Sequence, residues 1–301
     1  MKHLLTLEQL SKEELLDILN LADQLKFQKK NGIPHPILAG KTLGMIFQKS
    51  STRTRVSFEV GMHELGGQAL FLSSRDLQIG RGEPIQDTAR VLSRYLDGIM
   101  IRTYAQKEVE DLAKYGSVPV INALTDYCHP CQVLADLMTI REFKGSFEGL
   151  KATFIGDGNN MANSIIVGCL RLGMKVSIAS PKEYEICDHI KEFAKGYPSM
   201  FEMTNDPMAA AKDADVIFTD VWASMGQEGE KEKREKAFLG YQVNDEMMAI
   251  AHKDCMVQHC LPAHRGEEIT DKVFEEHADE IFEEAENRLH AQKAVLVKLM
   301  G

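Results

Sequence analysis

The chain has 301 residues, and its 45 acidic side chains outnumber its 35 lysines and arginines, which gives a formal net charge of −10. This balance argues against a nucleic-acid-binding protein, and no apolar run approaches the length of a membrane span, so we expect neither nucleic acid nor membrane as a partner. A hydrophobic content of 44% is typical of a globular enzyme, and a length of 301 residues leaves room for two domains. The polar start of the sequence resembles neither a secretory nor a mitochondrial import signal, and we expect a cytoplasmic protein.

The order of elements along the chain predicts a parallel α/β architecture. A first helix begins at Ser11, which forms a capping box with Glu14. Short apolar runs then alternate with helical patterns, and the predicted strands are 43–47, 69–72, 98–101, 118–122, 152–155, 176–179, 216–219 and 256–259. This alternation is typical of doubly wound sheets, and the segment 144–149 (K-G-S-F-E-G) is the best boundary between two of them. A run of charged residues at 227–236 is interpreted as a solvated loop or helix.

A cluster of hydroxyl and basic side chains follows the first predicted strand. Residues 50–55 read S-S-T-R-T-R and precede a helical pattern formed by Phe58, Met62 and Leu65. The first N–H groups of a helix and its dipole favour an anion, and arginine guanidinium groups match phosphate oxygens in bidentate fashion. The segment therefore predicts a phosphate site that does not depend on the glycines of a P-loop.

Two other motifs leave alternatives open. Cys128 and Cys131 form a C-x-x-C pair that could bind zinc, but the intervening proline and the helical pattern that follows argue against a structural zinc site, and the six cysteines are expected to be reduced. Residues 155–162 (I-G-D-G-N-N-M-A) resemble part of a dinucleotide loop, yet its third glycine position is Met161, so a nicotinamide cofactor is weakly supported. Asn159 and Asn160 suit either recognition of a zwitterion or local turn capping.

Chemically reactive or polar residues follow the predicted strands repeatedly. Ligands of parallel sheets bind beyond the carboxyl ends of the strands, and residues of both halves of the chain occupy that position: 51–55, Arg102, 129–132, 159–160, Asp220 and Cys260. These placements predict an active site in a cleft between two domains.

Four motifs then occur in order, and together they resemble the aspartate/ornithine carbamoyltransferases. They are S-T-R-T-R at 51–55, H-P-C-Q at 129–132, D-V-W-A-S-M-G at 220–226 and H-C-L-P at 259–262. The last two resemble the ornithine branch of the family, and the resemblance extends over essentially the whole chain. It implies transfer of the carbamoyl group of carbamoyl phosphate to the δ-amine of L-ornithine, giving citrulline and phosphate in arginine metabolism, with biosynthesis as the expected direction. It implies neither a metal nor an organic cofactor.

The resemblance also assigns domains and residues. Residues 1–145 are expected to bind carbamoyl phosphate and residues 146–301 to bind ornithine, with the last helix, from about residue 288 to 301, packed on the first domain. The residues expected to bind carbamoyl phosphate are Ser51, Thr52, Arg53, Thr54, Gln78, Arg102, His129, Gln132, Cys260, Leu261 and Arg288. Those expected to bind ornithine are Asn160, Asp220, Ser224 and Met225. Arg102, His129 and Cys260 are the expected catalytic residues. Leu261-Pro262 is expected to be a cis peptide, and Gln78 to reach a neighbour's site in a homotrimer.

Other functions are weaker. A transferase for putrescine would not need the S-M-G loop to hold a carboxylate, and one for aspartate would need basic residues there. N-acetylornithine remains an alternative acceptor. A non-catalytic metabolite sensor of the same fold would be expected to lose reacting-centre residues, whereas Arg102, His129, Gln132 and Cys260 are all present.

Overall fold

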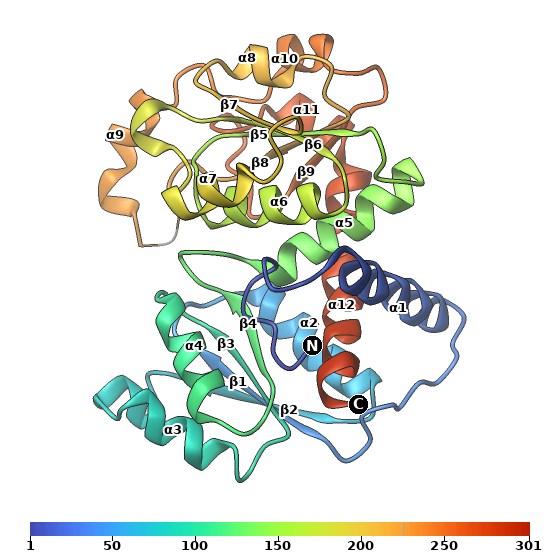
Figure 1. The fold of residues 1–301 in the computed structure, drawn as a ribbon, viewed down its shortest axis with the longest axis vertical. Coiled ribbons are helices and arrows are strands. Elements are labelled where there is room, and N and C mark those ends of the chain that lie inside the picture. Colours follow the sequence, from blue (N-terminus) through green and yellow to red (C-terminus); the bar gives the residue numbers. More distant parts are fainter. Residues whose placement is uncertain (225) are drawn as a thin grey trace. The chain divides into compact units, whose positions relative to one another are not determined.

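The computed structural model describes residues 1–224 and 226–301, which form two compact units (Figure 1). Unit 1 comprises Met1–Met138 and Glu286–Gly301, and unit 2 comprises Thr139–Ala285. The division falls inside two helices, α5 (Pro130–Lys144) and α12 (Ala278–Met300). Each unit contains its own parallel sheet covered by helices, so the predicted class of two parallel-sheet α/β domains is confirmed.

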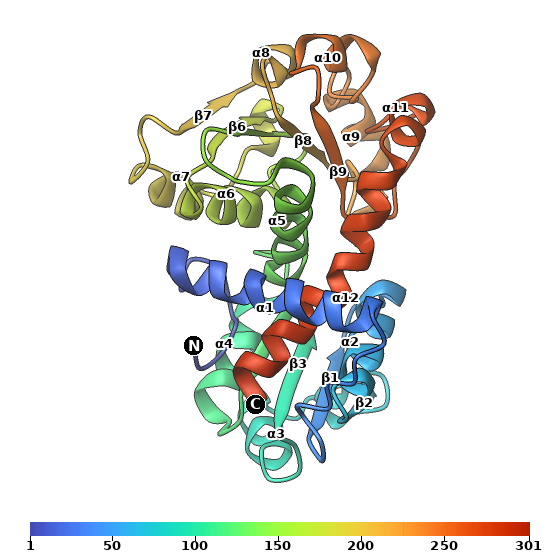
Figure 2. The same cartoon turned by 90° about the vertical axis from the view of Figure 1, so that its right-hand side faces the viewer.

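Unit 1 is built on a four-stranded sheet in the order β2-β1-β3-β4, with every pair parallel. The strands are β1 (Thr42–Phe47), β2 (Gln68–Ser73), β3 (Gly98–Arg102) and β4 (Val120–Leu124). The helices are α1 (Lys12–Lys30), α2 (Thr52–Glu64), α3 (Ile85–Leu92) and α4 (Gln106–Tyr115), with a 3-10 turn η1 (Gln78–Arg81). α3 and α4 cover one face of the sheet, and α1, α2 and the end of α12 lie on the other (Figures 1 and 2).

The core of unit 1 explains why these segments fold as they do. β1 and β3 are buried along almost their whole length, as expected for central parallel strands with helices on both faces. On the α3/α4 side, apolar side chains mainly of the strands and of the two helices pack in one cluster: Ile46, Ala89, Leu96, Ile99, Ile101, Val109, Leu112 and Val120. β4 begins two residues later than predicted. Pro119, just before it, has no N–H to donate, and only its carbonyl joins the sheet by accepting from the backbone of Ile99 (2.9 Å).

Unit 2 has a five-stranded parallel sheet in the order β7-β6-β5-β8-β9. The strands are β5 (Lys151–Ile155), β6 (Lys175–Ala179), β7 (Phe201–Thr204), β8 (Val216–Thr219) and β9 (Met256–His259). The helices are α6 (Asn160–Arg171), α7 (Asp188–Ala194), α8 (Pro207–Ala211), α9 (Lys231–Ala237), α10 (Asp245–Ile250) and α11 (Asp271–Glu276), with 3-10 turns η2 (Lys182–Tyr184) and η3 (Glu228–Glu230). α6 and α7 lie on one face of this sheet, and α8 and α10 lie on the other (Figures 1 and 2).

Two features of unit 2 differ from the sequence-based expectation. β7 was not predicted: it has only four residues, lies at the edge of the sheet and is half-exposed, so it lacks the continuous apolar run of a central strand. The charged run 227–236 was interpreted as solvated, and most of α9 is exposed, but Arg234 is buried with 6% exposure.

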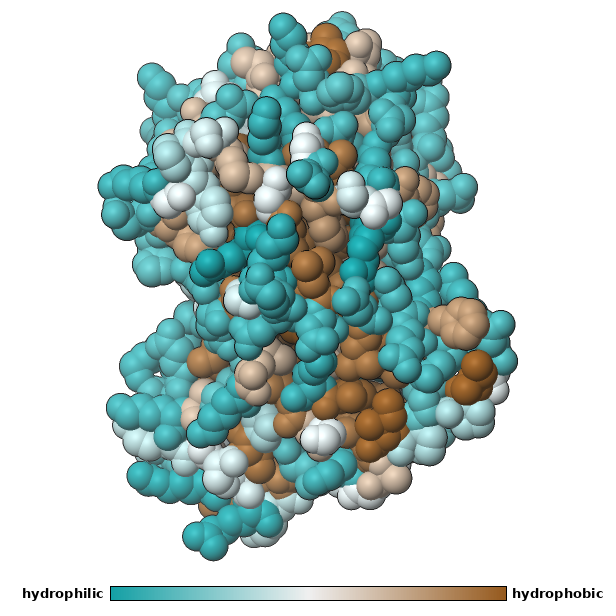
Figure 3. Space-filling view, turned by 45° about the vertical axis from the view of Figure 1, so that its right-hand side comes forward, coloured by the Kyte–Doolittle hydropathy of each residue, from teal (hydrophilic) through white to brown (hydrophobic). Residues whose placement is uncertain are grey.

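The surface is mostly hydrophilic on the face that Figure 3 shows, with hydrophobic residues in separate patches. Among the described residues, no helix is both long and apolar enough to cross a membrane. Large hydrophobic side chains that remain exposed in unit 1 include Val56, Leu70 and Phe71, which lie on α2 and on the edge strand β2.

Candidate functional site

The register of the unit 1 sheet brings two of the predicted motifs and Arg102 to one edge. Phe47, the last residue of β1, is the partner of Arg102 at the end of β3, and Arg102 is in turn the partner of Leu124 on β4. The backbone N–H of Gln48 donates to the carbonyl of Arg102 (2.9 Å). Because S-T-R-T-R follows β1 and H-P-C-Q follows β4, both segments leave the sheet at the edge where Arg102 lies.

The S-T-R-T-R segment forms the amino end of α2, as predicted. Ser51 is the N-cap residue, and its Oγ accepts from the backbone N–H of Thr54 (3.2 Å) and lies 3.1 Å from the Thr54 hydroxyl. Thr54 is fully buried, Arg53 is half-buried and Thr52 is exposed. The first turn of α2 contains no acidic residue, so the positive end of the helix dipole is not neutralised from within the helix.

Arg288 joins the other predicted residues of unit 1 to this helix end. It lies on α12 with 3% exposure, and its guanidinium donates to Gln132 Oε1 (2.6 Å) and to Thr54 Oγ1 (3.2 Å). One turn further along α12, Gln292 Oε1 accepts from Arg288 Nη2 (3.0 Å) and from Arg288 Nε (3.1 Å). Gln132 donates in turn to Asp136 (2.8 Å). A buried guanidinium thus fixes both an alcohol of the first turn of α2 and the side chain of the H-P-C-Q glutamine.

His129 is held as a neutral imidazole in this environment. It is 5% exposed, and burial first, followed by the charges of Arg288, Arg102 and Arg53, keeps the pKa of its ring well below the usual value. A neutral histidine carries one N–H and can donate it to an oxygen on which negative charge develops. Three arginines around one neutral donor form a site suited to an anion that has a carbonyl group.

In unit 2, Asp220 organises the predicted acceptor-binding residues. β8 ends at Thr219, whose partners in the sheet are Ile155 on β5 and His259 on β9, so the segments that follow these three strands meet at one edge. Asp220 Oδ2 accepts from the side-chain amide of Asn159 (2.8 Å). Its Oδ1 accepts from the backbone N–H of Val221 (2.8 Å) and from the Cys260 thiol (3.2 Å).

Asn159 is a supporting residue that the sequence did not single out from Asn160. It is the N-cap of α6, and its Oδ1 accepts from the backbone of Met161 (2.9 Å) and Ala162 (3.2 Å) while its amide holds Asp220. Of the two alternatives left open by the sequence, turn capping is confirmed for Asn159, and the same side chain also donates to Asp220. Asn160 and Ser224 are half-buried near the same strand ends, and Met225 lies outside the described residues.

A buried histidine–glutamate pair supports the H-C-L-P segment from behind. The Leu261 N–H donates to His259 Nδ1 (2.9 Å), so the proton of a neutral ring resides on Nε2, which faces Glu268 Oε1 (3.0 Å). His259 is 2% exposed and Glu268 is fully buried. The cis peptide expected at Leu261-Pro262 is present. Glu268 was missed by sequence reasoning, because nothing local relates a glutamate in the loop after 262 to the strand residue 259.

The cysteines and acidic clusters give little support to a metal centre. Burial, as the largest cause, raises the pKa of Cys128 and of Cys131 to about 12, which favours thiols over the thiolates that bind zinc. Among the described residues, His264, Glu267 and Glu268 have ligand atoms within 4.8 Å of one another. Both carboxylates already have partners, since Glu267 pairs with Lys231 (2.8 Å) and Glu268 accepts from the backbone N–H of His264 (2.6 Å).

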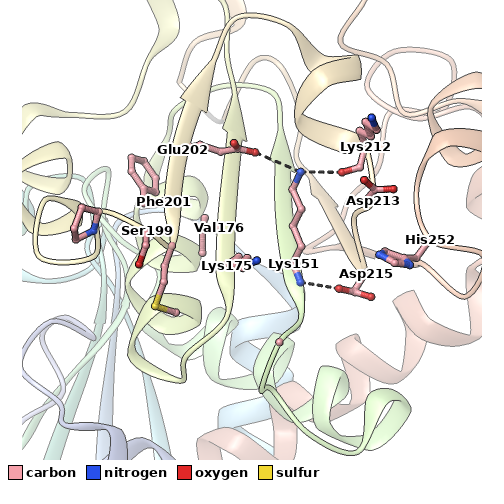
Figure 4. A pocket seen from close by; sticks show the side chains of 13 residues that line it. Lys151, Lys175, Val176, Ser199, Phe201, Glu202, Lys212, Asp213, Asp215 and His252 are labelled. Atoms are coloured by element: carbon pink, nitrogen blue, oxygen red, sulfur yellow. Dashed lines mark hydrogen bonds and ion pairs between the residues drawn. The ribbon is translucent and has the colours of Figure 1, made fainter.

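A hollow of about 640 Å³ lies at the opposite edge of the unit 2 sheet (Figure 4). It surrounds the amino ends of β5 and β6, where Lys151 pairs with Glu202 (3.3 Å) and its backbone N–H donates to Asp215 (2.7 Å). Its lining mixes lysines with carboxylates, and it contains none of the predicted site residues. Its position at the amino edge separates it from the carboxyl edge where Asp220 and Cys260 lie.

The chain is similar to known proteins over essentially its whole length. Residues 2–142 match the sequence profile described as aspartate/ornithine carbamoyltransferase, carbamoyl-P binding domain, and residues 148–299 match that of the Asp/Orn binding domain. The chain is 55% identical over 300 residues to ornithine carbamoyltransferase of Geobacter sulfurreducens, covering 99% of both chains. It is 54% identical over 304 aligned positions to that of Thermococcus kodakarensis, covering 100% of this chain and 96% of the relative. The solved structure of Pyrococcus furiosus ornithine carbamoyltransferase has a TM-score of 0.95 at 54% identity, covering 100% of this chain and 97% of that one.

Proposed function

Because the chain belongs to the aspartate/ornithine carbamoyltransferase family, we propose that it transfers the carbamoyl group of carbamoyl phosphate to the δ-amine of L-ornithine, giving L-citrulline and phosphate. The observation that carries the choice of acceptor is the identity of 54–55% to full-length ornithine carbamoyltransferases. The Asp220–Cys260 contact, with Asn159 behind it, supports it independently, since a carboxylate beside a thiol suits a substrate that approaches as an ammonium.

Unit 1 binds carbamoyl phosphate in this proposal. The phosphate accepts from the first turn of α2, through Ser51, Thr52, Arg53 and Thr54, and from Arg102. Gln132 holds the carbamoyl NH2 through Oε1, an oxygen that also accepts from Arg288. The Leu261 carbonyl is the second acceptor for the same NH2 group.

Unit 2 binds ornithine. Asn160, Asp220, Ser224 and Met225 hold its α-amino and carboxylate groups, and Asp220 and Cys260 face the δ-amine. Asp220 keeps its carboxylate oriented through three donors, so it attracts an incoming ammonium without having to reorganise. Cys260 is a hydrogen-bonding partner of that carboxylate and of the amine, and forms no covalent bond to the carbamoyl group.

The chemical step is a direct displacement at the carbamoyl carbon. The δ-ammonium first releases one proton to water, and the neutral amine then forms the N–C bond while the carbonyl electron pair moves to oxygen, where His129 and Arg102 stabilise the negative charge. Return of that pair breaks the C–O bond to phosphate. The nitrogen gives its surplus proton to the departing phosphate, whose oxygen has taken the electron pair of the broken C–O bond. Because His129 is neutral, it stabilises the oxyanion as a hydrogen-bond donor and does not transfer a full proton.

The test is formation of ureido product with four acceptors: ornithine, putrescine, N-acetylornithine and aspartate. We expect citrulline from ornithine and a kcat/KM for each of the others lower by at least about a hundredfold, because each lacks or masks a group that the site must pair. A preference for putrescine or N-acetylornithine would assign the chain to the alternative acceptor, and no product from any of the four would overturn the transferase assignment.

We also propose a homotrimer in which Gln78 completes a neighbour's carbamoyl phosphate site. Gln78 is exposed on η1, and the nearby edge strand β2 leaves Leu70 and Phe71 exposed at 37% and 40%. Arg55 stacks over the Phe71 ring at 3.9 Å, which orders this apolar edge. In a ring of three the contacts are heterologous, so one face of each subunit meets a different face of the next.

Hybrid assembly tests the shared site. An Arg53 variant and a Gln78 variant, each inactive alone, are dissociated, mixed and reassembled. Every mixed trimer then contains one site with both residues intact, and activity is expected to reappear only in the mixture. Hybrids that native mass spectrometry shows to be mixed and that stay inactive would exclude a shared site while leaving the transferase activity itself untouched.

The direction in the cell is proposed to be citrulline formation in arginine biosynthesis, within the cytoplasm. One solved relative, at 47% identity and a TM-score of 0.93, is the anabolic ornithine carbamoyltransferase of Campylobacter jejuni. Deletion of the gene is expected to make growth depend on added citrulline or arginine. Growth without either supplement, combined with failure to use citrulline as a source of carbamoyl phosphate in the wild type, would argue against both directions.

A further inference from the structure

The charged run 227–236 contains one residue that does not behave as a solvated charge. Arg234 lies on α9 with 6% exposure, whereas Lys231, Glu232 and Lys233 around it are exposed. Burying a guanidinium is costly unless its donors are paired, so a buried arginine in an otherwise exposed helix indicates a specific set of partners.

Two of those partners belong to different loops of unit 2. Arg234 Nη1 donates to Asp157 Oδ2 (2.7 Å) and to the backbone carbonyl of Trp222 (2.9 Å). Its Nε donates to Glu230 (3.1 Å), and its guanidinium carbon lies 4.8 Å from the centre of the Tyr184 ring. One side chain therefore connects the loop after β5 with the segment after β8.

Each of these loops carries a residue of the proposed ornithine site close to the point where Arg234 holds it. Asp157 is two residues before Asn159, whose amide donates to Asp220. Trp222 lies midway between Asp220 and Ser224. Arg234 thus fixes the backbone on both sides of the Asn159–Asp220 hydrogen bond without belonging to the set that contacts ornithine.

The loop that contains Asp157 is itself tightly seated. The Gly158 N–H donates to the Tyr184 carbonyl (2.7 Å), and a Cβ added at Gly158 would lie 2.3 Å from the backbone nitrogen of Ile186. On the other side, the Trp222 ring stacks on Phe238 at 5.8 Å with an interplanar angle of 16°. Both ends of the Arg234 connection are therefore packed, and a displacement at one of them is passed to the other.

We propose that Arg234, paired with Asp157, is a positioning residue that sets the affinity for the amino-acid acceptor. This rests on the proposed function and deepens it, because it assigns acceptor affinity to a pair that touches no substrate. The electrostatics of Asp157 agree with this pairing. Burial raises the pKa of its carboxyl to about 6, and the charge of Arg234 offsets only part of this rise. The other charges that face the carboxyl are those of Asp220 and Glu230. At neutral pH the carboxylate is thus ionised and attracts the guanidinium.

The experiment compares Arg234→Gln, Arg234→Lys, Asp157→Asn and the double variant Arg234→Gln/Asp157→Asn. Lys233→Gln is the matched control, since it removes a positive charge from the same helix at an exposed position. For each protein, kcat, the KM for ornithine and the Kd for carbamoyl phosphate are measured, with the melting temperature as a check on folding.

We expect Arg234→Gln and Asp157→Asn each to raise the ornithine KM by about tenfold or more, because each breaks the buried ion pair between the two residues, while the Kd for carbamoyl phosphate changes less than about twofold. Arg234→Lys is expected to recover part of the loss, since one ammonium cannot match the spread of donors that a guanidinium offers. The double variant should lose less than the product of the two single losses, because the two residues act as one unit. Lys233→Gln should behave as wild type.

Several results would overturn the proposal. An unchanged ornithine KM in Arg234→Gln would do so, as would equal losses for ornithine and carbamoyl phosphate, which indicate a general effect on folding. Multiplicative losses in the double variant would show that the two residues act separately. If Arg234→Gln fails to fold, the same criteria apply to Asp157→Asn, which removes only the charge. Wild-type protein that forms no citrulline would instead overturn the proposed function, so the two failures are distinguishable.

Discussion

Replacement of Asp220 by asparagine tests the acceptor site most directly, because three hydrogen-bonding partners of the carboxylate are known among the described residues. Its Oδ1 accepts from Val221 and Cys260, and its Oδ2 accepts from the Asn159 amide. An asparagine at 220 can keep its oxygen toward Val221 and Cys260, but its NH2 group then faces the NH2 group of Asn159. The opposite orientation sets the NH2 group against the fixed backbone N–H of Val221.

Asn159 cannot relieve this conflict by rotating its own amide. Its Oδ1 caps α6 by accepting from Met161 and Ala162, and rotation would leave those two N–H groups facing a donor. Loss of one hydrogen bond to a charged group, together with a buried unsatisfied donor, costs about 2–4 kcal/mol. When the transition state loses this stabilisation in full, kcat/KM for ornithine falls by roughly 30- to 700-fold.

The assay measures citrulline formation against ornithine concentration, with the Kd for carbamoyl phosphate and the melting temperature recorded for the same protein. The carbamoyl phosphate Kd should stay within about twofold of wild type, because unit 1 is unchanged. Asp213→Asn is the matched control: Asp213 is exposed, and its φ of 55° is one that asparagine also tolerates.

The double variant Asp220→Asn/Asn159→Asp separates pairing from charge. An aspartate at 159 still caps α6 and can accept from the asparagine at 220, so the melting temperature should return toward that of the wild type. Activity should recover only in part, because the negative charge no longer lies beside Cys260. A single Asp220→Asn variant with wild-type kcat/KM, or a double variant less stable than the single one, would refute the donor–acceptor reasoning.

Three further variants address the other half of the site and the loop. Arg53→Gly should fold normally yet lower kcat/KM for carbamoyl phosphate by about a thousandfold or more, since a charge-assisted contact to the substrate is lost; near-normal turnover would remove the phosphate role of α2. Ser224→Ala should weaken ornithine binding by about 1–3 kcal/mol, because the substrate loses a hydrogen-bonding partner. The backbone of this loop is held independently by Gln227, whose Oε1 accepts from the Ser224 N–H (3.0 Å), so an equal loss of carbamoyl phosphate binding would contradict a specific role. Cys260→Ser should lower kcat about tenfold and leave activity measurable, because a hydroxyl still donates to Asp220; a carbamoyl adduct on Cys260 seen by mass spectrometry during turnover would contradict direct transfer.

The sequence predicted most of the fold because parallel α/β units are encoded locally. Buried strands read as apolar runs, and several helices begin with a recognisable cap, as at Ser11, Ser51 and Asn159. The edge strand β7 escaped because its side chains are mostly in contact with solvent on both faces, so it has no apolar pattern to read. The start of β4 was placed two residues early because apolar character alone does not reveal that Pro119 cannot donate to the ladder.

The site residues also divide into those that local sequence motifs reveal and those that only folding brings together. Most residues expected to contact substrates lie within short motifs, because one strand end or one helix start must present several groups to one ligand. The others, and the residues that support the site, lie far away in the chain: Arg288, assigned through the family resemblance, is 156 positions from Gln132 and 234 from Thr54. No periodicity or composition relates such pairs, since their proximity exists only once the sheet and α12 have formed.

Arg234 shows why this second group is the harder one to find. In the sequence it is one cation among several in a charged run, and its neighbours on α9 are solvated. What distinguishes it is the partner set supplied by folding, Asp157 from 77 positions earlier and the Trp222 carbonyl from 12 positions earlier. A substrate-binding loop that follows a strand is held on one side only by the sheet, so its outer side needs a contact of this kind. Support from distant segments is therefore the expected counterpart of a site built from local motifs, and buried charges inside otherwise exposed helices are a practical way to find it.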